Sequence, residues 1–452
     1  MSQSLKMKRR DFLTAASASV GFGATVIPGS ALGLDGTPPP SERISMGLIG
    51  CGSHGAGWNL DRIFNNKDQQ VLAVCDVDSK HMNHASQRVE QHYSRTLKSR
   101  YSCRTTGDFR ELINQKDIDA VCVVTPDHWH TIPALMALKA GKHVISEKPM
   151  TLTVDEGRIL SDAAKASGKV FQTASENLSV ENYARMVELV QAGVLGKIKN
   201  IKVLLPPGNR MGNKGNFQEM APPPELNYEM WQGQAPLAPY CPARVHYNWR
   251  WNLAYSGGVL TDWIHHLLAL AMLATGTEKT GPVEVEGKGE LPDRSSVWNA
   301  APTYNLKYRF ANGMTMSIWD DVPGLKFEGT DGWLLCRGWR GPIKPSDPEL
   351  LKTELPKDKR LKRIRTDGQG GEHMDFTDAI KEGRQAYWPA EVGHRVITVA
   401  HIGNIAMSLN RKLQWDPAKE KFVNDPEADA MLSREQRDPW AIRNVDSWIN
   451  VG

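Results

Sequence analysis

The sequence is poor in cysteine, has no long apolar run and carries almost balanced charge. Its six cysteines are spread over 452 residues without a Cys-x-x-Cys pair, so their spacing indicates neither a zinc ribbon nor a disulfide framework. We therefore expect buried free thiols. Beyond residue 33 no run approaches the ~18 apolar residues of a transmembrane helix, so no membrane span is predicted in the mature protein. A formal net charge of +4 gives no basis for a nucleic-acid partner.

Length and composition indicate a globular protein with more than one domain. The 452 residues exceed one ordinary domain, and 40% hydrophobic with 23% charged residues is a balance that supports a sizeable core. Disordered and collagen-like classes are excluded by the same composition.

The first 33 residues have the features of an export signal. Arg9 and Arg10 precede Phe12 and a mildly apolar stretch rich in Ala, Gly and Ser. This pattern resembles a twin-arginine signal, and the alternative is an amphipathic helix with an incidental arginine pair. We predict a signal peptide over residues 1–33, a linker over 34–43 and a periplasmic location.

From residue 44 the pattern alternates between strand and helix. Residues 44–49 are an apolar strand, and residues 58–64 are typical of the helix that follows it. Between them, Gly50, Gly52 and Gly55 form Gly-x-Gly-x-x-Gly in the context that dinucleotide binding requires. Such glycines let the backbone turn tightly and approach a pyrophosphate, whose charge is met at the helix N-terminus.

A second apolar strand, residues 71–75, ends in an acidic residue. Asp76 follows Gly52 by 24 residues, the separation at which a carboxylate accepts hydrogen bonds from the ribose hydroxyls. The same negative charge repels a 2′-phosphate, so NAD is favoured over NADP. Asp78 could share this role.

Two further strands deliver polar residues to the sheet edge where such folds bind ligands. The strand 119–124 leads into residues 125–130, which read Thr-Pro-Asp-His-Trp-His. The strand 142–146 leads into Glu147, Lys148 and Pro149, and Pro149 biases Lys148 towards an extended turn. We therefore expect a lysine at the ligand edge of the sheet.

The glycine turn, the Thr-Pro-Asp-His-Trp-His run and Glu-Lys-Pro together resemble the Gfo/Idh/MocA oxidoreductase family, which includes glucose–fructose oxidoreductase and inositol dehydrogenases. The resemblance covers nearly all of the mature chain. It implies an α/β fold with an N-terminal Rossmann domain over residues 44–168 and a C-terminal α/β domain over residues 169–452. The second domain would contain a large, mostly antiparallel open sheet, and the resemblance implies a homo-oligomer that buries its exposed face.

The cofactor expected from these motifs is NAD, with NADP less favoured. The residues expected to contact it are Gly50, Gly52, Ser53, His54, Gly55, Asp76, Thr125, Pro126, His130, Glu147 and Lys148.

The later part of the chain is rich in strands. We expect strands over 198–205, 282–287, 304–310 and 314–319, and helices over 181–191, 373–382 and 392–410. A stretch rich in Pro, Lys and Gly over 341–371 is typical of an exposed loop. Residues 170–173 are typical of a last strand of the first sheet.

A second chemical motif contains Asp262 and His266. Four residues apart on a helix, their side chains project from one face. In the resembled family an Asp and a His at this spacing complete a catalytic triad with the lysine of Glu-Lys-Pro, which here is Lys148. Ile264 and Ala269 stand where the family commonly has glycine and aspartate, so the resemblance does not define the substrate class. The alternative is a surface ion pair or a buried structural histidine.

These residues suit hydride transfer from a secondary alcohol of a sugar or polyol. His266 would take the hydroxyl proton, Lys148 would hold the hydroxyl and stabilise developing oxyanion charge, and Asp262 would orient His266. Substrate contacts are expected from an aromatic and charged region that contains Arg244, His246 and Trp251, although each tryptophan there could equally serve packing.

Two other functions remain open. One is a non-redox lyase or glycoside hydrolase on the same fold, in which NAD is held and recycled or a metal replaces it. Candidate ligands are His128, His130, His246, Asp262 and His266, but their spacing matches no metal motif, so no metal site is predicted. The other is an exported binding protein that carries the cofactor without turnover.

Overall fold

The computed structural model describes residues 38–208, 215–338, 340–357, 360–361, 364 and 371–449. The expected signal peptide over 1–33 and the linker residues 34–37 lie outside these ranges. Met1–Glu42 is one unit, of which a 3₁₀ turn, η3 (Pro40–Glu42), is described, and Arg43–Gly452 is a second unit. Among the described residues, no helix combines the length and apolar character needed to cross a membrane.

The first sheet of the second unit is parallel and six-stranded. Its order is β3-β2-β1-β4-β5-β6, as a doubly wound dinucleotide-binding fold requires. The strands are β1 (Ile44–Ile49), β2 (Gln69–Cys75), β3 (Arg104–Thr106), β4 (Ala120–Val123), β5 (His143–Glu147) and β6 (Phe171–Ala174). The last strand follows residue 168, so the first sheet continues beyond the expected boundary at 168.

Helices connect these strands on both faces. They are η4 (Ser53–Asn59, π-helical), α2 (Leu60–Asn65), α3 (Ser79–Leu97), α4 (Phe109–Ile113), η5 (Asp127–Trp129), α5 (Thr131–Lys139) and α6 (Val154–Ser167). Local sequence explains where the longer ones begin. The Asp78 carboxylate accepts hydrogen bonds at the start of α3, and Thr153 caps α6 through the amide of Glu156.

The second sheet is nine-stranded and mostly antiparallel, with only β7 and β10 parallel among its described strands. Its order is β13-β12-β11-β7-β10-β9-β8-β14-β15. The strands are β7 (Ile198–Leu205), β8 (Glu284–Gly289), β9 (Tyr304–Arg309), β10 (Thr315–Asp320), β11 (Gly324–Gly329), β12 (Trp333–Arg337), β13 (Ile343–Pro345), β14 (Leu413–Asp416) and β15 (Lys421–Phe422). The expected fold class is thus confirmed.

Helices cover one face of this sheet. In β9 the side chains of Tyr304, Leu306 and Tyr308 are buried and alternate with exposed ones, the pattern of a sheet with one covered face. The helical elements are η6 (Glu176–Ser179), α7 (Glu181–Gln191), α8 (Tyr228–Gln232), η7 (His246–Trp251), α9 (Val259–Thr275), η8 (Pro348–Lys352), α10 (Gly371–Glu382), α11 (Ala390–Leu409), α12 (Pro426–Asp429) and η10 (Ile442–Trp448). The predicted helices α7, α10 and α11 are present, and β13 and η8 occupy part of the expected loop.

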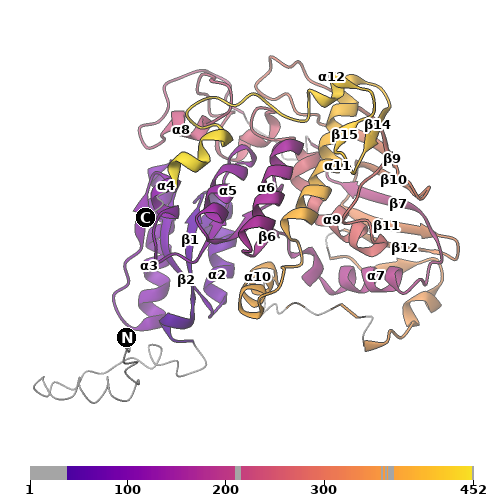
Figure 1. Ribbon diagram of the computed structural model, residues 1–452, viewed down its shortest axis with the longest axis horizontal. Helices are drawn as coiled ribbons and strands as arrows, with labels where there is room; N and C mark the ends of the chain where they lie inside the picture. The colour runs from indigo at the N-terminus through magenta and orange to yellow at the C-terminus, as the bar shows by residue number, and fades with distance from the viewer. Residues whose placement is uncertain are drawn as a thin grey trace, which may run out of the picture. The chain divides into compact units, whose positions relative to one another are not determined.

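Late segments of the chain return to the first sheet. Helix α10 packs against β5 and β6, and η10 packs against α5 (Figure 1). The Thr377 hydroxyl in α10 accepts hydrogen bonds from Asn66 Nδ2 at 2.8 Å and Gln69 Nε2 at 3.0 Å. The first domain is therefore completed by residues that lie far downstream. All six cysteines are buried and free, which confirms the expectation from their spacing.

Candidate functional site

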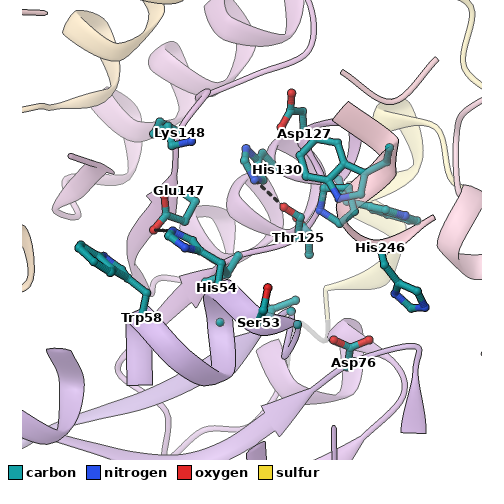
Figure 2. Close-up of a pocket in the computed structure, with 18 of the residues that line it drawn as sticks. Ser53, His54, Trp58, Asp76, Thr125, Asp127, His130, Glu147, Lys148 and His246 are labelled. Atoms are coloured by element: carbon teal, nitrogen blue, oxygen red, sulfur yellow. Dashed lines mark hydrogen bonds and ion pairs between the residues drawn. The ribbon is translucent and has the colours of Figure 1, made fainter. Parts of the chain in front are cut away.

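A cavity of about 550 Å³ runs along the carboxyl edge of the first sheet and is closed by η7 and α9 of the second domain. Figure 2 shows Asp76 and Lys148 at opposite sides of it, with Thr125 and His130 between them. The structure brings together every residue expected to contact the cofactor and the three expected catalytic residues. These are Gly50, Gly52, Ser53, His54, Gly55, Asp76, Thr125, Pro126, His130, Glu147, Lys148, Asp262 and His266.

The three glycines of the turn have different structural roles. Gly50 has φ of +95°, and a Cβ there would lie 2.4 Å from the Val124 carbonyl oxygen. A Cβ on Gly55 would lie 1.9 Å from the Gly50 oxygen, so both positions require glycine for packing. At Gly52 a Cβ would meet no described atom within 4 Å. Gly52 thus borders open space in the cavity, where the backbone can approach a pyrophosphate.

Asp76 ends β2 beside this turn. Its carboxylate accepts hydrogen bonds from the amides of Cys51 at 2.6 Å and Asp78 at 2.8 Å. Burial raises the pKa of Asp76, and these two hydrogen bonds oppose that shift. The carboxylate is held in place at the end of the cavity where a ribose diol would lie, so the site fits the adenosine half of NAD.

His130 contacts both the loop that follows β4 and the loop that follows β5. Its Nδ1 lies 2.6 Å from the Pro149 carbonyl oxygen and its Nε2 lies 2.8 Å from the Thr125 oxygen. Burial lowers the pKa of this imidazole. His130 therefore fixes the positions of Thr125 and the Lys148–Pro149 turn at the sheet edge.

Glu147 is held by the glycine-turn segment. His54 Nε2 donates to Glu147 Oε1 at 2.9 Å, and Asn59 Nδ2 donates to the same oxygen at 3.0 Å. Burial alone would raise the pKa of Glu147, but the charge and hydrogen bond of His54, the charge of Lys148 and the hydrogen bond from Asn59 outweigh it, so the pKa lies well below its usual range. Glu147 is consequently an anion that positions the turn before Lys148.

Lys148 reaches across the cavity to the second domain. Its Nζ lies 2.8 Å from Asp262 Oδ1, and Arg250 Nε lies 3.6 Å from the same oxygen. Burial would raise the pKa of Asp262, but the charges of Lys148 and Arg250 outweigh it and lower the pKa to about 2. Asp262 is thus ionised and holds two cations at the cavity wall.

His266 lies one turn further along α9. Its Nδ1 shares a hydrogen bond of 3.0 Å with Ser175 Oγ, in the segment that follows β6. Burial and the charge of Lys148 lower the pKa of His266 to about 3, so the imidazole is neutral at physiological pH. From the sequence we expected Asp262 to orient the His266 imidazole. In the structure Ser175 is a further partner, through Nδ1 of the ring.

Two buried carboxyl groups of the cavity were not expected from the sequence. Asp127, in the loop after β4, accepts a hydrogen bond of 2.7 Å from Ser256 Oγ, and burial with the charge of Asp262 raises its pKa to about 7. Burial likewise raises the pKa of Glu372 at the start of α10 to about 7. Asp127 belongs to the Thr-Pro-Asp-His-Trp-His run, which is the sequence signal that could have identified it. Glu372 enters the cavity only through the tertiary fold, so no local sequence pattern indicates it.

The structure places only one of the three residues expected to contact the substrate in the cavity lining. His246 lines the cavity, whereas Arg244 and Trp251 lie outside its lining. Arg244 Nε donates to the Pro239 oxygen at 3.1 Å, and the Trp251 indole donates to the Gly208 oxygen at 2.6 Å. The cavity is lined instead by Tyr247, Trp249, Arg250 and Trp263. Within the short 3₁₀ segment η7, sequence spacing does not specify that Tyr247, Trp249 and Arg250 face the cavity and Trp251 does not.

The five residues that the sequence analysis considered as metal ligands do not form one cluster in the structure. His128 Nε2 donates to the Trp231 oxygen at 2.9 Å, and His130 bridges two carbonyl groups. Of that set, only His246 lies in a described group of residues with metal-binding spacing, together with Asp78 and His81.

Comparison with family models covers most of the chain. Residues 44–175 match the oxidoreductase family NAD-binding Rossmann fold of GFO_IDH_MocA, and residues 183–442 match the oxidoreductase family C-terminal alpha/beta domain.

Curated relatives are similar over a shorter stretch. A glycosyl hydrolase family 109 protein of Shewanella amazonensis is 28% identical over 202 residues, which are 42% of this chain and 44% of the relative. A glycosyl hydrolase family 109 protein of Saccharopolyspora erythraea is 32% identical over 190 residues, 41% of this chain and 40% of that protein. The chain therefore spans less than half the length of these relatives.

Solved structures share the fold over nearly their full length. Aldose-aldose oxidoreductase from Caulobacter crescentus, complexed with glycerol, has a TM-score of 0.57 at 19% identity, covering 82% of this chain and 99% of that chain. Levoglucosan dehydrogenase with NADH and levoglucosan has a TM-score of 0.56 at 19% identity, with the same coverages of 82% and 99%. For myo-inositol 2-dehydrogenase from Lactobacillus plantarum the TM-score is 0.57 at 17% identity, again with 82% and 99% covered.

Proposed function

Because the chain belongs to the Gfo/Idh/MocA oxidoreductase family, we propose that it transfers hydride between NAD and a secondary hydroxyl carbon of a sugar or polyol. The observation that carries this proposal is the position of Lys148, Asp262 and His266 in the same cavity as the glycine turn. When bound, NAD supplies the hydride acceptor or donor. The open space at Gly52 and the carboxylate of Asp76 support its binding.

His266 is the residue that accepts the proton of the substrate hydroxyl. Its pKa of about 3 keeps the imidazole neutral, Ser175 holds the ring through Nδ1, and a ring nitrogen of this neutral imidazole accepts the hydroxyl proton as the carbinol is oxidised. In the reverse direction the same atom returns a proton to the alkoxide. Ser175 is therefore a positioning residue for the base.

Lys148 stabilises the charge that develops on the substrate oxygen. Its ammonium is held by Asp262, which leaves other N–H groups to donate to a hydroxyl or oxyanion in the cavity. A fixed cation of this kind contributes most when the oxygen carries negative charge in the transition state. Asp262 thus acts by positioning Lys148 as well as by its charge near His266.

The lining beyond Lys148 supports a sugar-like substrate. Tyr247, Trp249 and Trp263 offer flat rings, which cover the apolar faces of sugars. The Arg250 guanidinium lies 4.3 Å from the centre of the Trp249 ring and supplies donors for hydroxyl groups. Aromatic surface beside a fixed cation is a lining that suits a polyhydroxylated ring.

A second candidate function is glycosidic-bond cleavage with NAD recycled. The names of the curated relatives favour it, and so does one observation in the cavity. Asp127, with a pKa of about 7, lies near Asp262, with a pKa of about 2. Two carboxyl groups whose pKa values are separated by their environments are suited to acid and base roles. In this reaction the hydride removed from a carbinol returns to the sugar after bond cleavage.

The test begins with identifying the nucleotide released from purified protein. The protein is then screened with sugars, polyols and their keto forms while nicotinamide reduction is followed by absorbance. Lys148→Ala and His266→Ala should lower turnover by orders of magnitude with NAD binding retained, whereas Lys165→Ala on the surface of α6 should leave it unchanged. Near-normal turnover in both active-site variants would exclude the assigned roles.

The two candidates differ in their products. A dehydrogenase yields a keto sugar and one reduced nucleotide per turnover. Release of free sugar from aryl glycosides, with no net change in nucleotide oxidation state, would favour the glycosidase instead.

We also propose that the protein is exported to the periplasm by the twin-arginine route, on the basis of Arg9 and Arg10. That route carries folded proteins, which suits an enzyme loaded with its cofactor before export. Replacing both arginines with lysine should retain the protein in the cytoplasm, and unchanged export of this variant would refute the assignment.

A further inference from the structure

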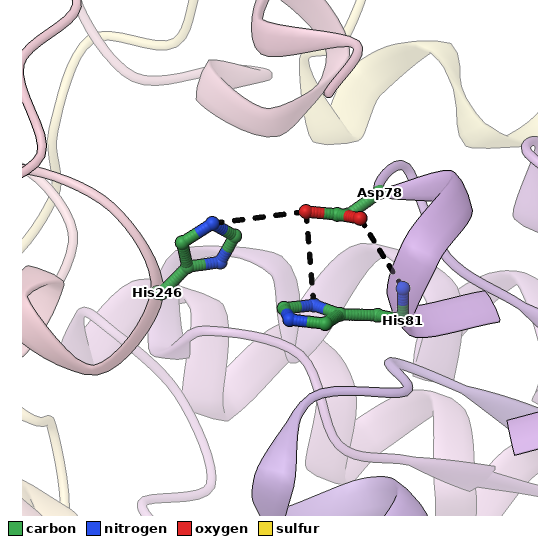
Figure 3. A group of neighbouring side chains, drawn as sticks. All are labelled: Asp78, His81 and His246. Carbon is green, nitrogen blue, oxygen red and sulfur yellow. Dashed lines mark hydrogen bonds and ion pairs between the residues drawn. The ribbon is translucent and has the colours of Figure 1, made fainter. Parts of the chain in front are cut away.

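Three side chains with metal-binding chemistry meet at the adenosine end of the cavity. Asp78, His81 and His246 each offer one ligand atom, and these atoms all lie within 4.8 Å of one another. Figure 3 shows the Asp78 carboxylate between the two imidazole rings. All three residues line the cavity, and His246 reaches the group from the second domain.

The spacing is too wide for direct hydrogen bonds. Asp78 Oδ2 lies 3.9 Å from His81 Nδ1 and 3.7 Å from His246 Nε2. A tetrahedral zinc ion with ligand bonds of about 2.0–2.2 Å separates its ligand atoms by roughly 3.4 Å. The two measured separations exceed this value by a few tenths of an ångström, and with all three ligand atoms within 4.8 Å of one another the imidazoles must turn towards the carboxylate to bind an ion.

The carboxylate is already oriented for such a role. Asp78 Oδ1 accepts hydrogen bonds from the amides of Lys80 at 2.9 Å and His81 at 3.2 Å at the start of α3. These bonds direct Oδ2 towards both imidazoles, and the Asp78 side chain is only 6% exposed. Outer hydrogen bonds that fix a ligand in this way are a regular part of metal sites.

His246 is the ligand that the second domain supplies. Its backbone has φ of +52°, in the left-handed region that non-glycine residues rarely adopt. Such conformations concentrate at binding sites, where surrounding structure holds them. Its ring lies 4.9 Å from that of His81, edge to face.

We propose that Asp78, His81 and His246 bind a divalent transition-metal ion of the zinc class. Two imidazoles and one carboxylate are the ligands that such ions prefer. The three ligands leave a fourth position open towards the cavity, for water or a ligand oxygen. This site is separate from the reaction centre at Lys148 and does not depend on the proposed function.

The ion would join the two domains beside the nucleotide site. Asp78 and His81 belong to the start of α3, and His246 begins η7 of the second domain. The same junction contains a β-bridge between Asp78 and Leu226 and an ion pair between Lys80 and Glu225. Metal binding should therefore raise the thermal unfolding temperature of the whole chain.

The test uses the full chain after removal of metal with a chelator and dialysis. Zn²⁺ is titrated by calorimetry, Co²⁺ is titrated by its visible absorption, and bound metal is counted by elemental analysis. The expected result is one ion per chain, with a tetrahedral Co²⁺ spectrum and a higher unfolding temperature. The readout is metal content and not turnover, so failure of the proposed hydride transfer does not affect it.

Variants identify the ligands. His81→Ala and His246→Ala should each weaken Zn²⁺ binding by more than the ~10- to 100-fold that loss of an outer partner costs. Asp78→Asn keeps an N-cap acceptor for α3 while removing the charge, and it should weaken binding similarly. His84→Ala, an exposed histidine on the same helix, is the matched control and should bind as the wild type does.

Both His81 and His246 are substantially exposed, so their alanine variants are expected to fold, which circular dichroism checks. Absence of stoichiometric Zn²⁺ or Co²⁺ binding in the wild type would overturn the proposal. Equal affinity in wild type, His81→Ala and His246→Ala would overturn it as well.

Discussion

Lys148 Nζ and Asp262 Oδ1, 2.8 Å apart, join the loop after β5 in the first domain to α9 in the second. Both side chains are largely buried, with 13% and 9% of their surfaces exposed. The pair therefore couples the geometry of the reaction centre to the association of the domains. Removing one partner leaves the other charge without compensation in a poorly solvated place.

The variant Asp262→Asn should lower both stability and turnover. It removes the charge that holds Lys148 and Arg250, and breaking a buried pair on one side costs about 3–5 kcal/mol of unfolding free energy. Urea unfolding measures this change, and Asp162→Asn, in an exposed pair with Arg158, should alter stability by less than about 0.5 kcal/mol. Equal unfolding midpoints for Asp262→Asn and wild type would contradict the buried-pair interpretation.

Alanine substitutions at two glycines of the turn should affect different properties, NAD binding in one variant and folding stability in the other. At Gly52, φ is −62° and a Cβ meets open space, so Gly52→Ala should fold normally but obstruct the dinucleotide and weaken NAD binding at least tenfold. At Gly55 the added Cβ lies 1.9 Å from the Gly50 oxygen, so Gly55→Ala should lose stability. Nucleotide titration and thermal unfolding of both variants give the comparison. The reverse pattern would place the pyrophosphate elsewhere.

Replacing Asp76 should change nucleotide preference. The variant Asp76→Ser removes the carboxylate that would accept the ribose hydroxyls and repel a 2′-phosphate. We expect weaker NAD binding and a ratio of NADP to NAD affinity that rises about tenfold or more, measured by competition binding. Asp117→Ser, at an exposed pair with Arg104, serves as the control. A ratio that does not change would remove Asp76 from nucleotide selection.

Stability should fall as the solution becomes acidic. Burial lowers the pKa of His265 from 6.5 to about 3, and neither ring nitrogen has a hydrogen-bond partner among the described residues. Between pH 6.5 and pH 3 the unfolded state binds a proton that the folded state excludes, so stability rises with pH in this window and is constant above it. At pH 5 this single residue costs about 2 kcal/mol relative to pH 8.

The variant His265→Phe should remove that contribution. It keeps a ring against Trp388 and has no titrating group, so the difference in unfolding free energy between pH 5 and pH 8 should shrink by about 2 kcal/mol. His84→Phe, at an exposed position, should leave the pH dependence as it is in the wild type. An unchanged slope in His265→Phe would show that this histidine is not the source.

The local sequence was sufficient to predict the first half of the cavity. A few adjacent residues were enough to identify the glycine turn, Asp76 and the strand ends at Thr125 and Lys148. Because parallel strands all have their carboxyl ends at one edge of the sheet, these residues could be predicted to lie together. The four-residue spacing of Asp262 and His266 was likewise enough to place both side chains on one helix.

Contacts set by tertiary structure could not be predicted in this way. Ser175 meets His266, and Glu372 enters the cavity, only because separate segments pack together. Arg250 lies in the 3₁₀ segment η7 and lines the cavity, whereas Arg244 lies in the turn before it, and sequence spacing does not encode which of the two faces the cavity. Strand β11 was missed because it begins and ends with glycine and carries Lys326 and Glu328, so its apolar content is weak.

The return of α10 and η10 to the first sheet has a consequence for biosynthesis. Strands β1 to β6 leave the ribosome long before Gly371, where the helix that covers β5 and β6 begins. The N-terminal domain therefore cannot be completed when its own strands have been synthesised, unlike a domain that folds as a unit as soon as it is made. The surface of β5, β6 and α5 that α10 and η10 cover stays uncovered until these late segments are made.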